Sequence, residues 1–502
     1  MIYLDNAATS FPKPPEVIRA MAGVEEKMGA NPGRGGHRLA LRAGRVVEHC
    51  REEAARLLGV HHPERILFTA NCTEALNLAI SGTLRRGDEV ICSYAEHNAV
   101  MRLLDRYVSR GEITVHMLAP DERGILSPAS LRRVISRKTA LVIIAHASNV
   151  TGLIQPIAQL GAVCRERGVP LLVDAAQTAG MADVSPDVLR ADMVAMPGHK
   201  GLLGPQGTGL LVLGYGMNPE PLLLGGTGSM SESVRQPDML PDRYESGTVN
   251  LPGIAGLYAG VKFVRAHRAE IEEYELALCD RLRARLREIP GVRILCDDGQ
   301  AHMAITSIVV PGHDGGALAD ALETALPAMD DTAFAVAQQW KDMDCYDFAG
   351  SGFEYACAFF GQAKVFEAIG RPAMYINTEE WLHLNFFVNH PEKIGTMIWA
   401  AEDNKADSRT LETIGYAKQL GRPLAIVTDR EMPDEKQAAV FIIPKAKNVL
   451  AESLYNFVPA CLVFGYLMTM LGERSGRGCE GPWSFSKGAA CVRQSEIVMV
   501  DD

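Results

Sequence analysis

One lysine stands where lysines are uncommon. Lys200 lies in the stretch ADMVAMPGHKGLLGPQGTG (residues 191–209), between a short apolar run and a glycine-rich turn. Most lysines lie on solvated helix faces, whereas a crowded and partly dry setting lowers the pKa of an amine and lets it attack a carbonyl carbon. The stretch alone fits two interpretations, a nucleophilic lysine or an ordinary lysine in a surface loop.

Other polar residues directly follow apolar, strand-like runs. Asp174 ends LLVD, and a buried carboxylate is costly unless it meets a positive partner, although many aspartates simply cap helices. His97 follows EVIC and suits stacking on an aromatic ring, moving protons, or capping the next helix. Thr73 follows ILFT and opens a helical run, so this position fits either a phosphate held at a helix N-terminus or a plain N-cap.

Together these residues describe one coherent chemistry. A lysine forms a Schiff base with an aldehyde, a carboxylate holds a ring nitrogen protonated, a helix N-terminus holds a phosphate, and a histidine stacks on the ring. Pyridoxal phosphate, which serves enzymes as an electron sink, needs this combination. The set therefore predicts a pyridoxal phosphate site, although no single member is specific for it.

The elements that must position these residues alternate along the first part of the chain. Apolar runs typical of buried strands occur at 66–69, 89–92, 141–145, 171–173, 193–196 and 210–213. Amphipathic helical patterns such as 46–58 and 103–110 lie between many of them. The alternation predicts an α/β fold with a mainly parallel sheet and helices on both faces. Ligands of such sheets bind outside the carboxyl ends of the strands, where the polar residues above are found.

Composition limits the classes of function. The 502 residues suggest about three domains, and 47% apolar and 22% charged residues are typical of globular proteins. A net charge of −11 without a basic block argues against nucleic-acid binding. The N-terminus lacks a signal-peptide pattern, and the apolar run 458–471 is interrupted by Pro459 and Gly465 and fits a core helix better than a membrane span. Eleven cysteines without a CxxC pair predict free thiols, no metal site and a cytoplasmic protein.

Residues 1 to about 323 resemble the class V aminotransferase family, and within it the cysteine desulfurases. The resemblance rests on many spaced motifs over more than half of the chain. The matching stretches are YLDNAATSFPKP (3–14), NPGRGGHRLA (31–40), TEALN (73–77), EHNA (96–99), VDAAQ (173–177), PGHKGLLGPQGTG (197–209) and RYESGTVN (243–250).

The resemblance implies a role for each matching residue. Lys200 would form the Schiff base and move the substrate's α-proton, Asp174 would pair with the pyridinium nitrogen, and Gln177 would contact the ring hydroxyl. His97 would stack on the ring with Asn149 beside it. Thr73 and His199 would hold the phosphate, with Cys72 as a further cofactor-binding residue. A glycine-rich segment, Gly226, Thr227 and Gly228, would reach the partner's phosphate across a homodimer. The implied substrate is a small amino acid such as cysteine.

The resemblance ends before the family's last subdomain. Desulfurases carry a mobile cysteine late in the chain, in a loop resembling Arg-x-Gly-x-His-Cys, which takes up the substrate sulfur. Here GGALADALE (315–323) continues as TALPAMDD, and no such loop follows. Cys345 in DMDCYDF and Cys357 in YACAFF fit strand or core positions. We therefore expect a type I pyridoxal phosphate fold that lacks most of its C-terminal subdomain, and no desulfuration by this chain alone.

The rest of the chain has its own α/β pattern. Strand-like runs occur near 346–349, 395–400, 425–428 and 440–443, and the first is followed by Gly350-Ser351-Gly352 and a long helical run. Glu367, Glu380 and His383 suit enolisation of a sugar by proton transfer, or they are a solvated glutamate pair and a core histidine. The pattern predicts a second doubly wound unit.

Residues 326–502 resemble a sugar isomerase (SIS) domain, the second of the two found in glucosamine-6-phosphate synthases and fructosamine phosphate deglycases. The resemblance implies a three-layer α/β/α fold that binds a phosphosugar, with Glu367 as the enolisation base and His383 assisting ring opening. A basic residue near the sugar would be Lys487 or Arg493. The family's Ser/Thr-rich phosphate loop is missing, because 401–408 reads AEDNKADS.

Three origins fit a join near 323–326. The chain is a natural fusion, a remodelled enzyme whose second module replaces the lost subdomain, or a chimera of neighbouring genes. Three functions are open in turn: a pyridoxal phosphate enzyme acting on a small amino acid, a phosphosugar isomerase or deglycase, and a non-catalytic protein that retains its ligands.

Overall fold

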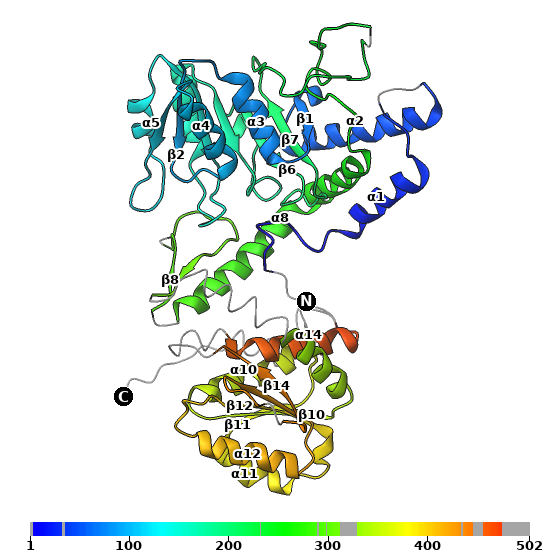
Figure 1. Cartoon of the computed structure of the whole chain (residues 1–502), viewed down its shortest axis with the longest axis vertical. Helices are drawn as coiled ribbons and strands as arrows, with labels where there is room; N and C mark the ends of the chain where they lie inside the picture. Colours follow the sequence, from blue (N-terminus) through cyan, green and yellow to red (C-terminus); the bar gives the residue numbers. More distant parts are fainter. Residues whose placement is uncertain are drawn as a thin grey trace. The chain divides into compact units, whose positions relative to one another are not determined.

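The computed structural model describes residues 4–32, 36–230, 232–288, 291–297, 299–311, 329–432, 435–444 and 455–473. The chain divides into two compact units, which are described separately (Figure 1). The first comprises Tyr3–Glu288 and Val292–Val309, and the second begins at Val310. The join predicted near 323–326, Lys487 and Arg493 lie outside the described residues.

A seven-stranded sheet with the order β1-β7-β6-β5-β4-β2-β3 forms the centre of the first unit. β7 runs antiparallel to both of its neighbours, and the other recorded pairings are parallel. The strands are β1 (Ile66–Thr69), β2 (Glu89–Ser93), β3 (Thr114–Leu118), β4 (Thr139–Ala145), β5 (Leu171–Asp174), β6 (Met193–Pro197) and β7 (Gly209–Leu213). The prediction of a mainly parallel sheet is confirmed, and β3 is the strand that the sequence pattern did not reveal.

Helices cover both faces of this sheet, which explains why its inner strands β4, β5, β6 and β7 are largely apolar and buried. In β4, Val142 and Ile144 pack into a core with α2, α6 and α8, whereas Leu141 and Ile143 pack into a second core with α3 and α4. The helices are α1 (Pro15–Lys27), α2 (Arg38–Leu58), α3 (Cys72–Thr83), α4 (Asn98–Ser109), α5 (Pro128–Val134), α6 (Ile157–Arg167), α7 (Pro186–Leu189) and α8 (Leu251–Arg287), with the 3-10 helix η1 (Pro63–Arg65). A small antiparallel pair, β8 (Arg293–Ile294) and β9 (Ile308–Val309), follows α8.

The second unit contains a five-stranded parallel sheet with the order β11-β10-β12-β13-β14. Its strands are β10 (Cys345–Gly350), β11 (Ala373–Asn377), β12 (Ile394–Trp399), β13 (Leu424–Thr428) and β14 (Ala438–Ile442). Its helices are α10 (Phe353–Ala368), α11 (Thr378–Leu384), α12 (Asp407–Gln419) and α14 (Val458–Met470), with the 3-10 helices η2 (Asn385–Phe387) and η3 (Pro391–Lys393); residues 329–340 are also helical.

Each face of the second sheet has its own helical layer. α10 and α14 pack with Phe348 and Trp399 on one face, and α11 and α12 pack with Ala349 and Ile398 on the other (Figure 1). The doubly wound α/β layout expected from the sequence is therefore present, although β11 had not been predicted. Within the described part of the chain, no helix combines the length and apolarity needed to cross a bilayer.

Candidate cofactor site

Lys200 lies three residues beyond β6, at the carboxyl edge of the first sheet. The loop that carries it packs closely on the turn after β5, since a Cβ on Gly201 would lie 2.3 Å from the carbonyl oxygen of Ala179. Lys200 is half-buried, and this burial lowers the pKa of its amine, while the negative charge of Asp174 opposes the shift. The structure thus favours the nucleophilic lysine over a fully solvated one.

Asp174 is the last residue of β5 and is only 4% exposed. One carboxylate oxygen, Oδ1, accepts the backbone N–H of Ala176 at 2.9 Å and the thiol of Cys72 at 3.6 Å. Burial raises the pKa of Asp174, and these hydrogen bonds together with the charges of His97 and Lys200 oppose the rise. A buried carboxylate in these surroundings is stabilised by a nearby positive charge.

The N-termini of two helices face the same edge. Asn71 caps α3 by accepting the N–H of Glu74, which leaves Cys72 and Thr73 in the first helical turn. His97 caps α4, because its Nδ1 accepts the N–H of Ala99 at 3.1 Å. His97 is therefore a helix cap, as one interpretation of the sequence held, and it also borders the cavity described next.

Most of the predicted cofactor residues surround one cavity of about 160 Å³. These residues follow strands that are distant in sequence, and they meet because parallel strands end at a common edge of the sheet. The predicted residues that line it are Cys72, Thr73, His97, Asn149, Asp174, Gln177, His199 and Lys200. His199 is held by Thr9, whose hydroxyl lies 3.0 Å from its Nδ1, and burial lowers the pKa of His199.

Thr227 and Gly228 lie elsewhere. They line a separate cavity of about 320 Å³ beside Arg51 and Glu245, so one chain alone does not bring them to Lys200. The contribution of this segment to a partner's site stays a prediction.

Two charged residues close to the site were not singled out by the sequence. Glu96 precedes His97, and its Oε1 accepts the hydroxyl of Ser93 at 2.6 Å and the N–H of Ala145 at 3.0 Å. Lys13 donates to the carbonyl oxygen of His199 at 2.7 Å. Both lie in stretches that carried the family resemblance, but nothing in the residue pattern showed that they are shielded from solvent.

The second unit does not bring Glu367 and His383 of one chain together, and their predicted roles as enolisation base and ring-opening histidine stay predictions. From β10 the chain crosses to β11 on one side and then returns past β10 to β12 on the other. Right-handed crossovers in opposite directions place their helices on opposite faces of the sheet, and Glu367 on α10 is thus separated from His383 on α11 by the sheet.

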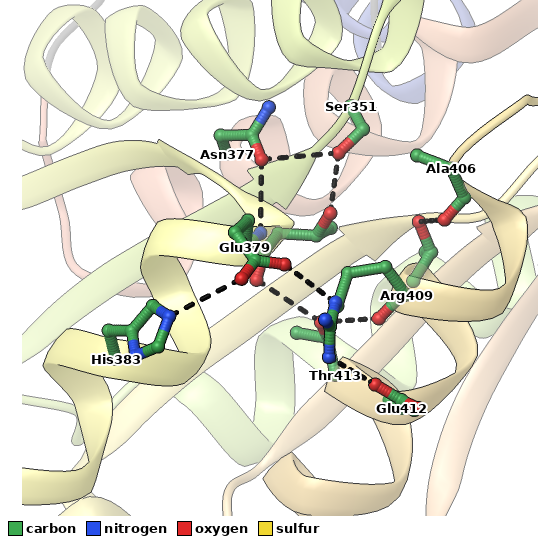
Figure 2. Close-up of polar contacts among 10 residues, drawn as sticks. Ser351, Asn377, Glu379, His383, Ala406, Arg409, Glu412 and Thr413 are labelled. Atoms are coloured by element: carbon green, nitrogen blue, oxygen red, sulfur yellow. Dashed lines mark hydrogen bonds and ion pairs between the residues drawn. The ribbon is translucent and has the colours of Figure 1, made fainter.

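The two residues have exposed ionic partners instead. Glu367 pairs with Lys364 one helical turn away. Figure 2 shows His383 beside Glu379, with Nε2 and Oε1 3.3 Å apart, and Glu379 in turn pairs with Arg409 at 2.6 Å. His383 is 76% exposed, so the alternative of a core histidine is wrong.

Cys345 and Cys357 occupy strand and core positions, as expected from the sequence. Cys357 is fully buried on α10 in the core beneath the sheet. Cys345 begins β10 and is partly buried, and burial raises the pKa of its thiol. Neither has the exposed setting of a mobile sulfur carrier.

Comparison with known proteins supports the same assignment for the first part of the chain. The sequence pattern of the class-V aminotransferases matches residues 2–329. A probable cysteine desulfurase of Methanothermobacter thermautotrophicus is 34% identical over 302 residues, which are 59% of this chain and 75% of that protein. One of Pyrococcus abyssi is 33% identical over 327 residues, or 62% of this chain and 79% of the relative.

The fold agrees with solved structures of the same kind. The apo structure of a cysteine desulfurase from Thermococcus onnurineus NA1 superposes with a TM-score of 0.60 at 32% identity, covering 64% of this chain and 82% of that one. A NifS-like protein superposes with a TM-score of 0.58 at 26% identity, covering 64% and 85%. The chain belongs to the class-V aminotransferase family, and its first part is similar to cysteine desulfurases.

Glu96 makes the stability of the first unit depend on pH. Burial raises its pKa from 4.5 to about 8, although its hydrogen bonds oppose the rise. Between these values the folded protein binds more protons than the unfolded chain, so the free energy of unfolding falls as pH rises, by at most about 1.4 kcal/mol per pH unit. Glu96→Gln keeps a hydrogen-bond acceptor at the same place and removes this loss of unfolding free energy. The free energy of unfolding of the variant, relative to the native protein, should therefore rise from pH 5 to pH 8.

Thiol labelling of the buried Cys164 during urea titration reports unfolding of this unit. Glu26→Gln, at an exposed glutamate on α1, is the matched control and should leave the pH profile unchanged. If the free energy of unfolding depends on pH in the same way for Glu96→Gln and the native protein, Glu96 is ionised in the folded protein, which contradicts the prediction.

Proposed function

We propose that the first unit binds pyridoxal phosphate and acts on a small amino acid such as cysteine. The main support is the convergence of Lys200 and Asp174 on one cavity, from the ends of adjacent strands, in a chain of the class-V aminotransferase family. When bound, this cofactor supplies an aldehyde for a lysine or substrate amine and an electron sink for charge developing at the substrate Cα.

The residues present fit the cofactor. Asp174 is a buried carboxylate that a protonated ring nitrogen would satisfy, and the neighbouring thiol of Cys72 steadies its Oδ1. Thr73, in the first turn of α3, and His199 would hold the phosphate at the positive end of the helix. His97 would stack on one face of the ring, and Gln177, which donates to the carbonyl oxygen of Ala7 at 3.3 Å, would reach the ring hydroxyl.

Lys200 would have two tasks. Its partly desolvated amine loses a proton more easily than a solvated lysine, which suits it to bind the cofactor's aldehyde carbon. With the substrate bound, the Nζ of Lys200 would also serve as the base that takes the proton from the substrate Cα. Thr227 and Gly228 would complete the phosphate site of a second subunit, which makes a homodimer the proposed assembly.

We infer that this chain does not complete desulfuration by itself. That reaction needs a thiolate that attacks the substrate sulfur, and no loop of the desulfurase type follows residue 323 in the sequence. Among the described residues, the cysteine that lines the cavity is Cys72, which lies against Asp174. Burial and the charge of this carboxylate raise the pKa of its thiol well above the ordinary value. Such a thiol is a poor nucleophile.

Lys200→Ala should abolish the absorbance band of the lysine-bound cofactor at roughly 410–430 nm. The purified native protein, supplied with pyridoxal phosphate, should show this band after unbound cofactor is removed. Lys27→Ala, at an exposed lysine at the end of α1, controls for the loss of a lysine elsewhere and should retain it. A band that survives in Lys200→Ala would place the covalent link on another residue.

As a second function, we propose that the C-terminal unit binds a phosphosugar, as an SIS domain does. The support is the doubly wound sheet, in which the loop Gly350-Ser351-Gly352 leaves β10 at the point where the strand order reverses. The hydroxyl of Ser351 is buried there beside Thr378. Glu367 and His383 of one chain do not share this site, so catalysis through both would need a second subunit.

Tryptophan fluorescence tests this proposal selectively, because all four tryptophans, at positions 340, 381, 399 and 483, fall after residue 310. Fructose 6-phosphate at millimolar concentration should raise the melting temperature of this signal by about 2–4 °C for each kcal/mol of binding energy, and fructose should not. Ser351→Ala should weaken the shift. No shift at millimolar phosphosugar would contradict phosphosugar binding.

A further inference from the structure

A second cavity adjoins the cofactor cavity. Its volume is about 420 Å³, and it shares Lys200 and Gln177 with the cavity assigned to the cofactor. The N-terminal segment, α8 and residues 303–305 form its other walls. If Gln177 reaches the ring hydroxyl as proposed, this cavity opens on the side of the ring that carries the reactive aldehyde, where a substrate amine must arrive.

Lys13 is the cation in this wall that has no role in the cofactor site. Its ammonium donates to the hydroxyl of Ser10 at 2.6 Å and to the carbonyl oxygen of His199 at 2.7 Å, which are both neutral acceptors. No ion pair with Lys13 occurs among the described residues. Burial alone lowers its pKa to about 8. A partly desolvated ammonium without a carboxylate gains from an anionic ligand.

The segment that carries Lys13 is fastened to the loop of Lys200. The N–H of Ser10 donates to the carbonyl oxygen of His199 at 3.1 Å, and its hydroxyl lies 3.1 Å from the carbonyl oxygen of Lys200. Ser10 is buried, and α1 begins at Pro15 directly after this segment. These hydrogen bonds fix the backbone that carries Lys13 relative to the backbone that carries Lys200, and both side chains line the same cavity.

The remaining walls suit a small zwitterion. Met181, Phe263 and Met303 provide apolar surface for a short side chain. Glu275 on α8 contributes the cavity's carboxyl group, and burial raises its pKa. Glu275 makes no ion pair with Lys13, so the charge of Lys13 remains available to a ligand.

We propose that Lys13 binds the α-carboxylate of the amino-acid substrate. The proposal rests on the proposed function of the first unit. In an amino acid the carboxylate is two bonds from the amine, so an amine that reaches Lys200 presents its carboxylate to the same cavity wall. Lys13 is thus a substrate-positioning residue for the reaction centred on Lys200.

L-Alanine and ethylamine provide the test, because they differ only in the carboxylate. Each is titrated into cofactor-loaded protein, and the change of the cofactor absorbance gives an apparent Kd. Lys13→Met should weaken L-alanine binding roughly 10- to 100-fold, as expected for a lost hydrogen bond to a charged group, and leave ethylamine binding within about twofold. Lys13→Arg should restore most of the preference for L-alanine, and Lys27→Met should equal the native protein.

The outcomes separate the two proposals. An equal loss for both ligands, with the native cofactor band retained, would show that Lys13 only supports the Lys200 loop and would overturn carboxylate binding. Unchanged binding of both ligands in Lys13→Met would overturn it as well. A native protein that shows no cofactor band would overturn the proposed function itself, and the proposal for Lys13 would fall with it.

Discussion

The first unit depends on one buried charge. Asp174 ends a strand of a sheet covered on both faces, where a carboxylate loses its hydration and the fold itself supplies only a backbone N–H, a weak thiol donor and more distant positive charges. The half-buried amine of Lys200 lies in the same cavity, and burial disfavours its charged form as well. A ligand with a protonated ring nitrogen and an electrophilic carbon relieves both costs at once. Both costs are what the proposed cofactor would offset.

The sequence predicted that these residues gather at one place because they follow a topological rule. Asp174, His97, Asn149 and Lys200 each come shortly after an apolar strand, and parallel strands end at one edge, so their order along the chain was sufficient to group them. Lys13 has no such signal. It precedes α1 and reaches the site only because its segment folds back on the Lys200 loop through contacts across more than 180 positions. Contacts of that kind cannot be read from local periodicity.

The second unit shows the opposite case. Its strands and helices were mostly visible as apolar runs. The sequence did not show that Glu367 and His383 lie on opposite faces of the sheet, because spacing along the chain does not show which face a crossover helix covers. β11, which reads AMYIN, was not predicted from the sequence, and missing it hid the reversal of direction that separates Glu367 from His383. A site inferred from residue types needs the strand order before its members can be paired. Glu367 and His383 could act on one substrate only if they come from two different chains.

The most direct test of the central claim locates the covalent link itself. Cofactor-loaded protein is reduced with borohydride, digested, and searched by mass spectrometry for the peptide that carries the reduced cofactor. We expect the modification on Lys200, within the stretch 191–209, and on no other lysine at comparable occupancy. Modification of Lys13 in its place, or a protein that remains unmodified after loading and reduction, would contradict the account.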